Sequence, residues 1–212
     1  MILVVDHYDS FTYNLVQLIE TLGATTEVVK SDAEPAEALV AREPAAVVLS
    51  PGPGRPEDAG CFTELLRILP DATPVLGVCL GHQAMGIVAG ARVERVTPVH
   101  GKASLVHHDG RGILSDVANP FEAGRYHSLV VTREGLPPEL ELTAWSDDEL
   151  VMAAQHRTLP RFGVQFHPES ILTPDGPTII RNFLSLVGQR TRARAREGPE
   201  PFGSGPTKDG RS

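Results

Sequence analysis

Short apolar runs alternate with amphipathic stretches along residues 1–90. The apolar runs are rich in Val, Ile and Leu and predict strands buried on both faces of a sheet, at 1–6, 25–29, 46–50 and 74–78. Between them, apolar residues recur at helical spacing and predict helices at 11–22, 35–42, 61–69 and 80–90. Ser10 is the predicted cap of the first helix, and Gly23 its stop signal. This alternation predicts an α/β fold with a mostly parallel central sheet flanked by helices.

The middle and the end of the chain have different patterns. Between Arg92 and His156 the apolar runs are short and turn-rich segments separate them, which predicts a smaller antiparallel portion. The α/β pattern returns with "RFGVQF" and a helix near 174–186, which Thr173 is predicted to cap. After Gln189 the apolar pattern ends and Arg, Gly and Pro predominate. We therefore expect one domain over 1–188 and a disordered C-terminal tail over 189–212.

Composition limits the function classes. The 212 residues, 41% hydrophobic and 22% charged, are typical of one globular domain. With 19 Lys and Arg against 27 Asp and Glu, the net charge of −8 argues against binding nucleic acid or an anionic membrane. The first residues are interpreted as a core strand and not as a signal peptide. Only two cysteines, Cys61 and Cys79, are present, so a reducing cytoplasm is the expected location.

One of these cysteines lies in a motif associated with nucleophiles. "GVCLG" places Cys79 as G-x-C-x-G between a predicted strand and a predicted helix, the pattern of a nucleophile elbow. Gly77 and Gly81 leave room for a tight turn, and a sulfur at a helix N-terminus is favoured as thiolate. The backbone N–H of Leu80 would point toward a developing oxyanion. The motif alone leaves open the alternative that Cys79 is a small buried core residue.

A cysteine nucleophile needs a base, and eight histidines compete for that role. His167, in "GVQFHPES", follows a predicted strand and so lies at a sheet edge where catalytic residues of open α/β folds gather. Glu169 could accept its ring N–H and fix the tautomer. By itself, H-P-E is more typical of a surface turn with a solvated pair. Beside G-x-C-x-G, the catalytic interpretation is favoured.

A third motif follows the third predicted strand. "LSPGPGRP", residues 49–56, predicts a rigid loop whose free N–H groups can approach a ligand, and Gly52 could supply a second oxyanion donor. The alternative is a structural turn. Zinc is disfavoured because the chain has no C-x-x-C or H-E-x-x-H spacing. Cys61 lacks flanking glycines and is interpreted as structural.

Taken together and in this order, "SPGPGRP", "GVCLGHQAMG", "RYHSLVV" and "GVQFHPESILTP" resemble the class I (triad-type) glutamine amidotransferase domains. The resemblance covers residues 1–187 and implies a flavodoxin-like fold. The opening "DHYDSFTYNLVQ" and "HGK" at 100–102 narrow it to the small subunit of anthranilate synthase and the glutaminase subunit of aminodeoxychorismate synthase. The family usually has "DNYDSF", so His7 is a departure.

The resemblance implies a Cys-His-Glu triad. Cys79 would attack the side-chain amide of glutamine, His167 would move the protons, and Glu169 would orient His167. A γ-glutamyl thioester would release ammonia and then, with water, glutamate. The implied substrate-binding residues, with the oxyanion-hole donors Gly52 and Leu80 among them, are Gly52, Pro53, Gly54, Leu80, Gln83, Ser128 and Leu129. No metal or organic cofactor is implied in this subunit, and any magnesium would belong to the synthase.

The implied partner is a chorismate-binding synthase in a hetero-oligomer, which would use the ammonia in tryptophan biosynthesis or, alternatively, in folate biosynthesis. Two other functions stay open at this stage. One is a stand-alone γ-glutamyl hydrolase that needs no partner. The other is a non-catalytic subunit that only binds glutamine, although a silent subunit would have no need of an intact triad.

Overall fold

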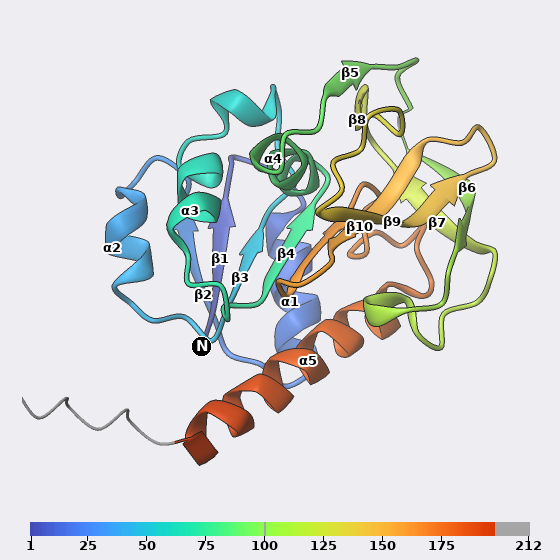
Figure 1. Cartoon of the computed structure of the whole chain (residues 1–212). Coiled ribbons are helices and arrows are strands. Elements are labelled where there is room, and N and C mark those ends of the chain that lie inside the picture. Colours follow the sequence, from blue (N-terminus) through green and yellow to red (C-terminus); the bar gives the residue numbers. More distant parts are fainter. Residues whose placement is uncertain (100, 198–212) are drawn as a thin grey trace, which may run out of the picture.

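One large sheet runs through the whole molecule (Figure 1). In the computed structural model, which describes residues 1–99 and 101–197, nine strands of this part of the chain form the sheet in the order β2-β1-β3-β4-β11-β10-β9-β6-β7. The strands are β1 Ile2–Asp6, β2 Thr26–Lys30, β3 Ala46–Leu49, β4 Val75–Val78, β6 Lys102–His108, β7 Phe121–Arg125, β9 Leu140–Ser146, β10 Val151–His156 and β11 Arg161–Val164. A separate antiparallel pair is formed by β5 Val93–Arg95 and β8 Leu129–Val131.

Five of the nine strands form the parallel half that the apolar runs predict. β2, β1, β3, β4 and β11 are parallel neighbours, and β1, β3 and β4 are buried along their whole length. Their order, with β2 on one side of β1 and with β3, β4 and β11 on the other, is the flavodoxin-like arrangement. Both faces are covered, which explains why these strands are continuous apolar runs.

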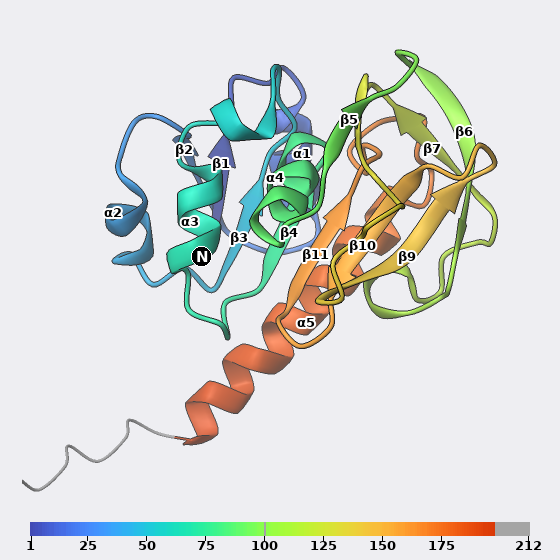
Figure 2. The same cartoon turned by 45° about the horizontal axis from the view of Figure 1, so that its top comes forward.

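Helices cover the two faces in two groups (Figure 2). The helices are α1 Thr12–Thr21, α2 Ala36–Val40, α3 Phe62–Ile68, α4 Leu80–Val88 and α5 Gly176–Glu197, with short 3₁₀ turns η1 Pro56–Asp58 and η2 Gly112–Leu114. On one face α1 and α5 pack on Ile2 and Val4 of β1. On the other face α2, α3 and α4 pack on Leu3 and Val5 of the same strand. Successive residues of β1 thus enter opposite cores.

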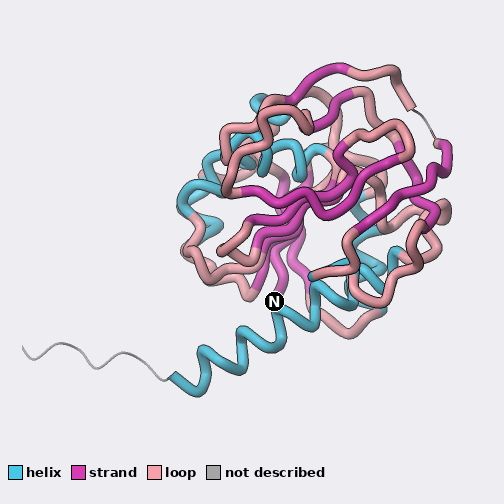
Figure 3. Tube along the Cα trace, turned by 45° about the vertical axis from the view of Figure 1, so that its right-hand side comes forward, coloured by secondary structure: helices cyan, strands magenta, loops and turns pink. Residues whose placement is uncertain are grey.

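The predicted antiparallel portion is confirmed, and it continues the central sheet. β10 is antiparallel to β11 and to β9, and β6 is antiparallel to β9 and to β7. Figure 3 shows these strands side by side with the parallel half. The junction is the β11–β10 pair, so β11 has a parallel neighbour on one edge and an antiparallel neighbour on the other.

Two predicted helix caps are wrong. α1 begins at Thr12, and no side chain caps its N-terminus. The carboxylate of Asp9, and not Ser10, accepts the N–H of Phe11, at 2.7 Å. Thr173 does not cap α5 either, because its hydroxyl bonds the backbone of two other segments. Short polar residues are interchangeable in a local pattern, and the fold selects which one meets the backbone.

The last helix is longer than expected. α5 runs to Glu197, so 189–197 are helical where the sequence predicts the tail to begin. This segment is rich in Arg and Ala, which are good helix formers even without an apolar face. Its last turns leave the body of the molecule (Figures 1 and 3), and residues 198–212 lie outside the described part of the chain. Within 1–99 and 101–197, no helix is long and apolar enough to cross a membrane.

Docking of α5 onto the sheet offers a test of this packing. Phe183 is fully buried and lies edge-to-face on Phe162 of β11, with ring centroids 6.3 Å apart. We expect Phe183→Ala to lower the free energy of unfolding by about 3–5 kcal/mol, through lost burial and a cavity. Urea denaturation measures this. The matched control on the same helix is Ser185→Ala, at an exposed position, where a comparable loss would argue against the assigned packing.

Candidate active site

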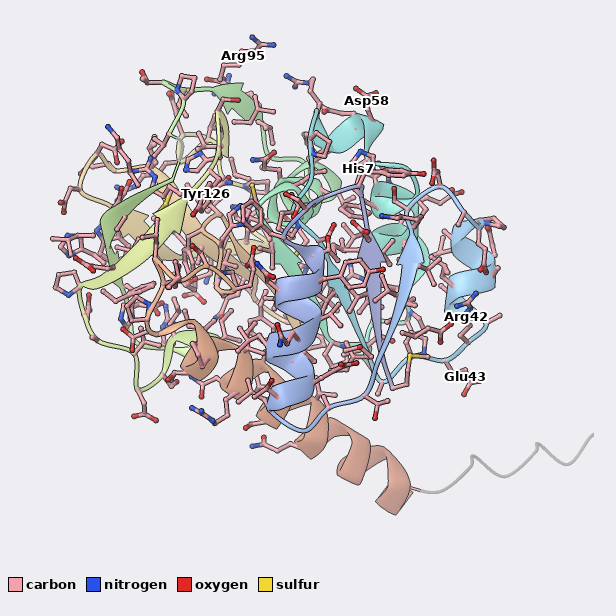
Figure 4. The ribbon with its side chains drawn as sticks, turned by 180° about the vertical axis from the view of Figure 1, so that it is seen from behind. His7, Arg42, Glu43, Asp58, Arg95 and Tyr126 are labelled. Carbon is pink, nitrogen blue, oxygen red and sulfur yellow. The ribbon has the colours of Figure 1, made fainter. Side chains whose placement is uncertain are left out.

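The carboxyl ends of four neighbouring parallel strands meet at one edge of the sheet. In the sheet register Leu49 of β3 lies beside Gly77 of β4, and Val164 of β11 lies beside Val78. The segments that follow β3, β4 and β11 therefore emerge side by side. Figure 4 shows His7, which follows β1, and Tyr126 at this end of the molecule, with Glu43 at the opposite end. The candidate residues of the motifs that follow β3, β4 and β11 lie along this edge.

Cys79 is the single residue between β4 and α4. Its backbone has φ 51° and ψ −98°, a conformation that costs a non-glycine residue about 1–3 kcal/mol. The surrounding structure holds it there: its N–H donates to the Val164 carbonyl at 2.8 Å, and its carbonyl accepts the Gln83 N–H at 3.0 Å. The predicted strand-to-helix turn is therefore present, with a strained residue at its corner.

The two glycines of the motif make this turn possible. A Cβ at Gly77 would lie 2.5 Å from the backbone carbonyl of Gly81, and a Cβ at Gly81 would lie 2.5 Å from the Leu49 carbonyl oxygen. Both distances are too short for any side chain, because the opposing atoms are backbone and cannot move aside. Strand β4, helix α4 and strand β3 are thus in direct backbone contact around Cys79.

His167 and Glu169 form a buried pair. The Nδ1 of His167 lies 2.6 Å from Oε1 of Glu169, and their side chains are only 4% and 0% exposed. The His167 ring also packs edge-on against Tyr126 and Phe11, with centroids 5.0 and 5.8 Å away. The alternative of a solvated surface turn is therefore wrong for this H-P-E segment. The partner at Nδ1 leaves Nε2 as the nitrogen for proton transfer.

The protonation of His167 is determined by Cys79 and Glu169. Burial by itself lowers the pKa of His167, but Cys79 and Glu169 outweigh burial and raise this pKa well above its ordinary value. Nε2 has no hydrogen-bond partner of standard geometry, yet Cys79 is close enough for its charge to affect the ring. The site therefore favours an imidazolium between Cys79 and a carboxylate.

Two other buried histidines near the site, His82 and His127, have lowered pKa values. Burial, and then the charge of His127, lower the pKa of His82 to about 3. Burial and then Arg125 lower the pKa of His127 to about 4. His82 lies behind the turn, against Gly163 of β11. His167, whose pKa is raised, therefore differs from both of these buried histidines.

Thr173 holds the loop that carries the pair. Its hydroxyl donates to the His167 carbonyl at 2.7 Å and accepts the Gly124 N–H at 2.9 Å. The N–H of His167 donates to the Gly124 carbonyl at 3.1 Å. The loop after β11 is thus fixed to β7 of the antiparallel half. This is the role of Thr173 in place of the predicted helix cap.

The predicted oxyanion donors lie against each other. A Cβ at Gly52 would lie 2.8 Å from the Leu80 side chain and 2.7 Å from the His7 carbonyl oxygen. The loop after β3 therefore touches both the start of α4 and the end of β1. Pro53 and Gly54 are exposed further along this loop, and Gly54 has φ 84°, which glycine adopts without strain.

The predicted substrate residues on α4 and β8 are also brought together. The side-chain N–H₂ of Gln83 donates to the Leu129 carbonyl at 2.9 Å and to Oε1 of Gln165 at 3.1 Å. Ser128, the residue before Leu129, is exposed. Gln165 in turn donates from Nε2 to the Sγ of Cys79, at 3.4 Å. The candidate glutamine-binding residues and the candidate nucleophile are therefore connected by hydrogen bonds.

Sequence reasoning missed Gln165. A signal was available, because Gln165 is a polar residue in the apolar run "RFGVQF" and shares the two-residue period of His167. Asp9, in the opening "DHYDSF", was also missed. Burial raises the pKa of Asp9, and the charge of Glu169 raises it further. The opening motif thus reaches the site from β1.

The two cysteines differ in their surroundings. Cys61, at the start of α3, is buried, and this burial raises the pKa of its thiol to about 11. Such a thiol is almost entirely protonated near neutral pH and is a poor nucleophile. Both cysteines are free. Within the described residues, no group of three or more His, Cys, Asp or Glu side chains could hold a metal ion.

The buried His82 makes stability depend on pH. Below about pH 6.5 the unfolded chain binds a proton at this ring and the folded chain does not, so stability falls on acidification. Between pH 7 and pH 5 we expect His82 to contribute a loss of about 2 kcal/mol in the free energy of unfolding.

Urea denaturation of His82→Leu at both pH values tests this. The difference between the two pH values should shrink by about 2 kcal/mol relative to the unmodified protein. His107→Leu, at a half-exposed position, is the control. An unchanged pH dependence in His82→Leu would contradict the lowered pKa.

Comparison with known proteins places these motifs in context. The family model "Glutamine amidotransferase class-I" matches residues 3–187. The chain is 49% identical to anthranilate synthase component 2 of Azospirillum brasilense over 189 residues, 88% of this chain and 96% of that protein. It is 49% identical to aminodeoxychorismate synthase of Streptomyces griseus over 195 residues, 91% of this chain and 27% of that protein.

Two further similarities concern a longer protein and a solved structure. The bifunctional protein TrpGD of Thermotoga maritima is 47% identical over 188 residues, and the chain spans only 32% of its length. The crystal structure of a Thermoplasma acidophilum protein, provisionally described as one of the subunits of a GMP synthase, has a TM-score of 0.81 and 25% sequence identity. That match covers 91% of this chain and 96% of the other.

Proposed function

Because the chain belongs to the class I glutamine amidotransferase family, we propose that Cys79, His167 and Glu169 hydrolyse L-glutamine, and that the ammonia serves a chorismate-aminating synthase. The observation that carries the triad assignment is the buried His167–Glu169 pair beside the strained turn of Cys79. These residues come from two motifs far apart in the sequence, and the fold brings them to one edge of the sheet.

The proposed reaction follows from this geometry. His167 Nε2 takes the proton of the Cys79 thiol, and the sulfur attacks the side-chain amide carbon of glutamine. The amide oxygen becomes an oxyanion, which the N–H groups of Leu80 and Gly52 stabilise. His167 then protonates the leaving nitrogen, so ammonia departs and a γ-glutamyl thioester remains. Water, deprotonated by His167, hydrolyses the thioester to glutamate. Glu169 keeps the ring oriented throughout.

Substrate recognition is proposed to use the remaining predicted residues. The N–H₂ group of the Gln83 amide is engaged by Leu129 and by Gln165. Its Oε1 is therefore the atom left to accept a hydrogen bond from the substrate, for which the α-ammonium group of glutamine is the suitable donor. Ser128 and the loop residues Pro53 and Gly54 are exposed, and we propose that they contact the same ligand.

The proposed partner is anthranilate synthase, and the alternative is aminodeoxychorismate synthase. Relatives named as anthranilate synthase components support the first, since the chain matches 96% of the Azospirillum protein's length. The chemistry described needs no metal or organic cofactor in this chain, and magnesium is expected on the synthase. We further propose that the protein works in the cytoplasm, where reducing conditions keep the Cys79 thiol available.

Replacing the nucleophile tests the triad. Cys79→Ala in the complex with the synthase should abolish glutamine-dependent synthesis and leave ammonia-dependent synthesis intact, because only the ammonia supply is lost. Cys61→Ala is the matched control and should keep both activities. The rate of product formation with each nitrogen source is the measurement, and glutamine-dependent synthesis by Cys79→Ala would disprove the nucleophile assignment.

Reconstitution with each candidate synthase tests the partner. The isolated chain should hydrolyse glutamine slowly and faster with its partner, and the product should be anthranilate. Chromatographic identification of 4-amino-4-deoxychorismate would instead place the protein in folate synthesis. Full glutaminase activity without any synthase would favour the stand-alone γ-glutamyl hydrolase.

A further inference from the structure

A chain of buried amides ends on the sulfur of Cys79. It starts at the Leu129 carbonyl, passes through the side chains of Gln83 and Gln165, and reaches Sγ at 3.4 Å. Gln83, Gln165 and Cys79 are 2%, 0% and 7% exposed, so water does not compete for these hydrogen bonds. Buried amides in a sheet core are costly unless each is satisfied. This series of hydrogen bonds provides partners for the side-chain amides of Gln83 and Gln165.

The Leu129 carbonyl determines which group donates in each of these hydrogen bonds. The Leu129 carbonyl can only accept, so the Gln83 group facing it must be the N–H₂. The same N–H₂ lies 3.1 Å from Gln165, and the Gln165 atom facing it must therefore be Oε1. The other end of the Gln165 amide, which faces Sγ, is then its N–H₂. The sulfur consequently receives an N–H donor from this residue.

The position of Gln165 is rigid. Its backbone N–H donates to the Met152 carbonyl at 2.8 Å, which ties the end of β11 to β10. Gln165 and the fully buried Phe166 lie in the bend that follows β11, and His167 is the next residue. The segment after β11 thus presents both the base and an N–H donor to Cys79.

We propose that Gln165 holds the Cys79 thiolate, by donating a hydrogen bond to the negative sulfur that remains when His167 has taken its proton. No proton passes through Gln165, since an amide N–H is not acidic enough to transfer it. Gln83 keeps the Gln165 amide turned in the donating direction. The inference rests on the proposed role of Cys79 as the nucleophile, and it adds a residue outside the triad.

An alternative role for Gln165 is packing alone. In that case the amide would only fill space and satisfy Gln83, and the reactivity of the sulfur would not depend on its N–H. The two roles differ in what they predict for the free enzyme. A donor to the thiolate changes how fast Cys79 reacts with an electrophile even when glutamine is absent.

The experiment compares Gln165→Met with the unmodified full-length chain. Methionine has nearly the same length and no N–H donor. The measurement is the rate constant for iodoacetamide alkylation of Cys79 as a function of pH, followed by mass spectrometry of the Cys79 peptide. We expect the rate at pH 7 to fall about tenfold and the pH profile to move upward, as for loss of a hydrogen bond to a charged group.

The other titratable groups around the triad are unchanged in this variant. They are Glu169 in the same loop, which raises the pKa of His167, and Asp9 after β1 and His127 before β8, whose pKa values the charge of His167 lowers. In the synthase complex, kcat for glutamine should fall with KM little changed. Gln155→Met, on β10, removes an amide that donates to Glu141 instead. This control should leave both alkylation and kcat unchanged.

A folded Gln165→Met chain that is alkylated at the unmodified rate over the whole pH range would overturn the proposal. If this variant does not fold, Gln83→Met decides instead. It frees the Gln165 amide to turn, so alkylation of Cys79 should slow severalfold, and an unchanged rate would also overturn the proposal. Retention of glutaminase activity after complete alkylation of Cys79 in the unmodified protein would disprove the nucleophile assignment itself.

Discussion

Backbone contact between β3, β4 and α4 is the constraint on which the site depends. Gly77 and Gly81 allow the start of α4 to touch both strands, and no other residue type fits at either position. Because the helix begins one residue after the strand, Cys79 is forced to a φ of 51°. The strain places its side chain at the carboxyl edge of the sheet, beside the first N–H groups of α4, where negative charge is favoured.

The second requirement is that β11 is the last strand of the parallel half and pairs directly with the antiparallel half. Its parallel contact with β4 sets Gln165 and His167 next to Cys79, and its antiparallel contact with β10 stiffens the strand end. The loop that follows is fixed to β7 through Thr173 and Gly124. The antiparallel half therefore contributes to the proposed catalysis indirectly, because it positions the base. Tyr126, which follows β7, also packs against the His167 ring.

Local sequence patterns predicted most of the fold for a physical reason. Buried parallel strands need continuous apolar runs, and the helices between them need an apolar stripe, so element order follows from periodicity. The patterns failed where several polar residues could serve one backbone group. Asp9 took the place expected for Ser10, and Thr173 bonded a loop and a strand instead of a helix. The helix through Glu197 was missed because its last turns have no apolar face.

The sequence by itself determined the turn at Cys79 and the adjacency of His167 and Glu169, since both depend on residues at most a few positions apart. Tertiary structure decided that this pair is buried, and that the pKa of His167 is raised while those of His82 and His127 are lowered. It also placed Gln165 on a sulfur 86 positions away along the chain. Desolvation and contacts between distant segments arise only from the order of strands in the sheet, and no local spacing encodes them.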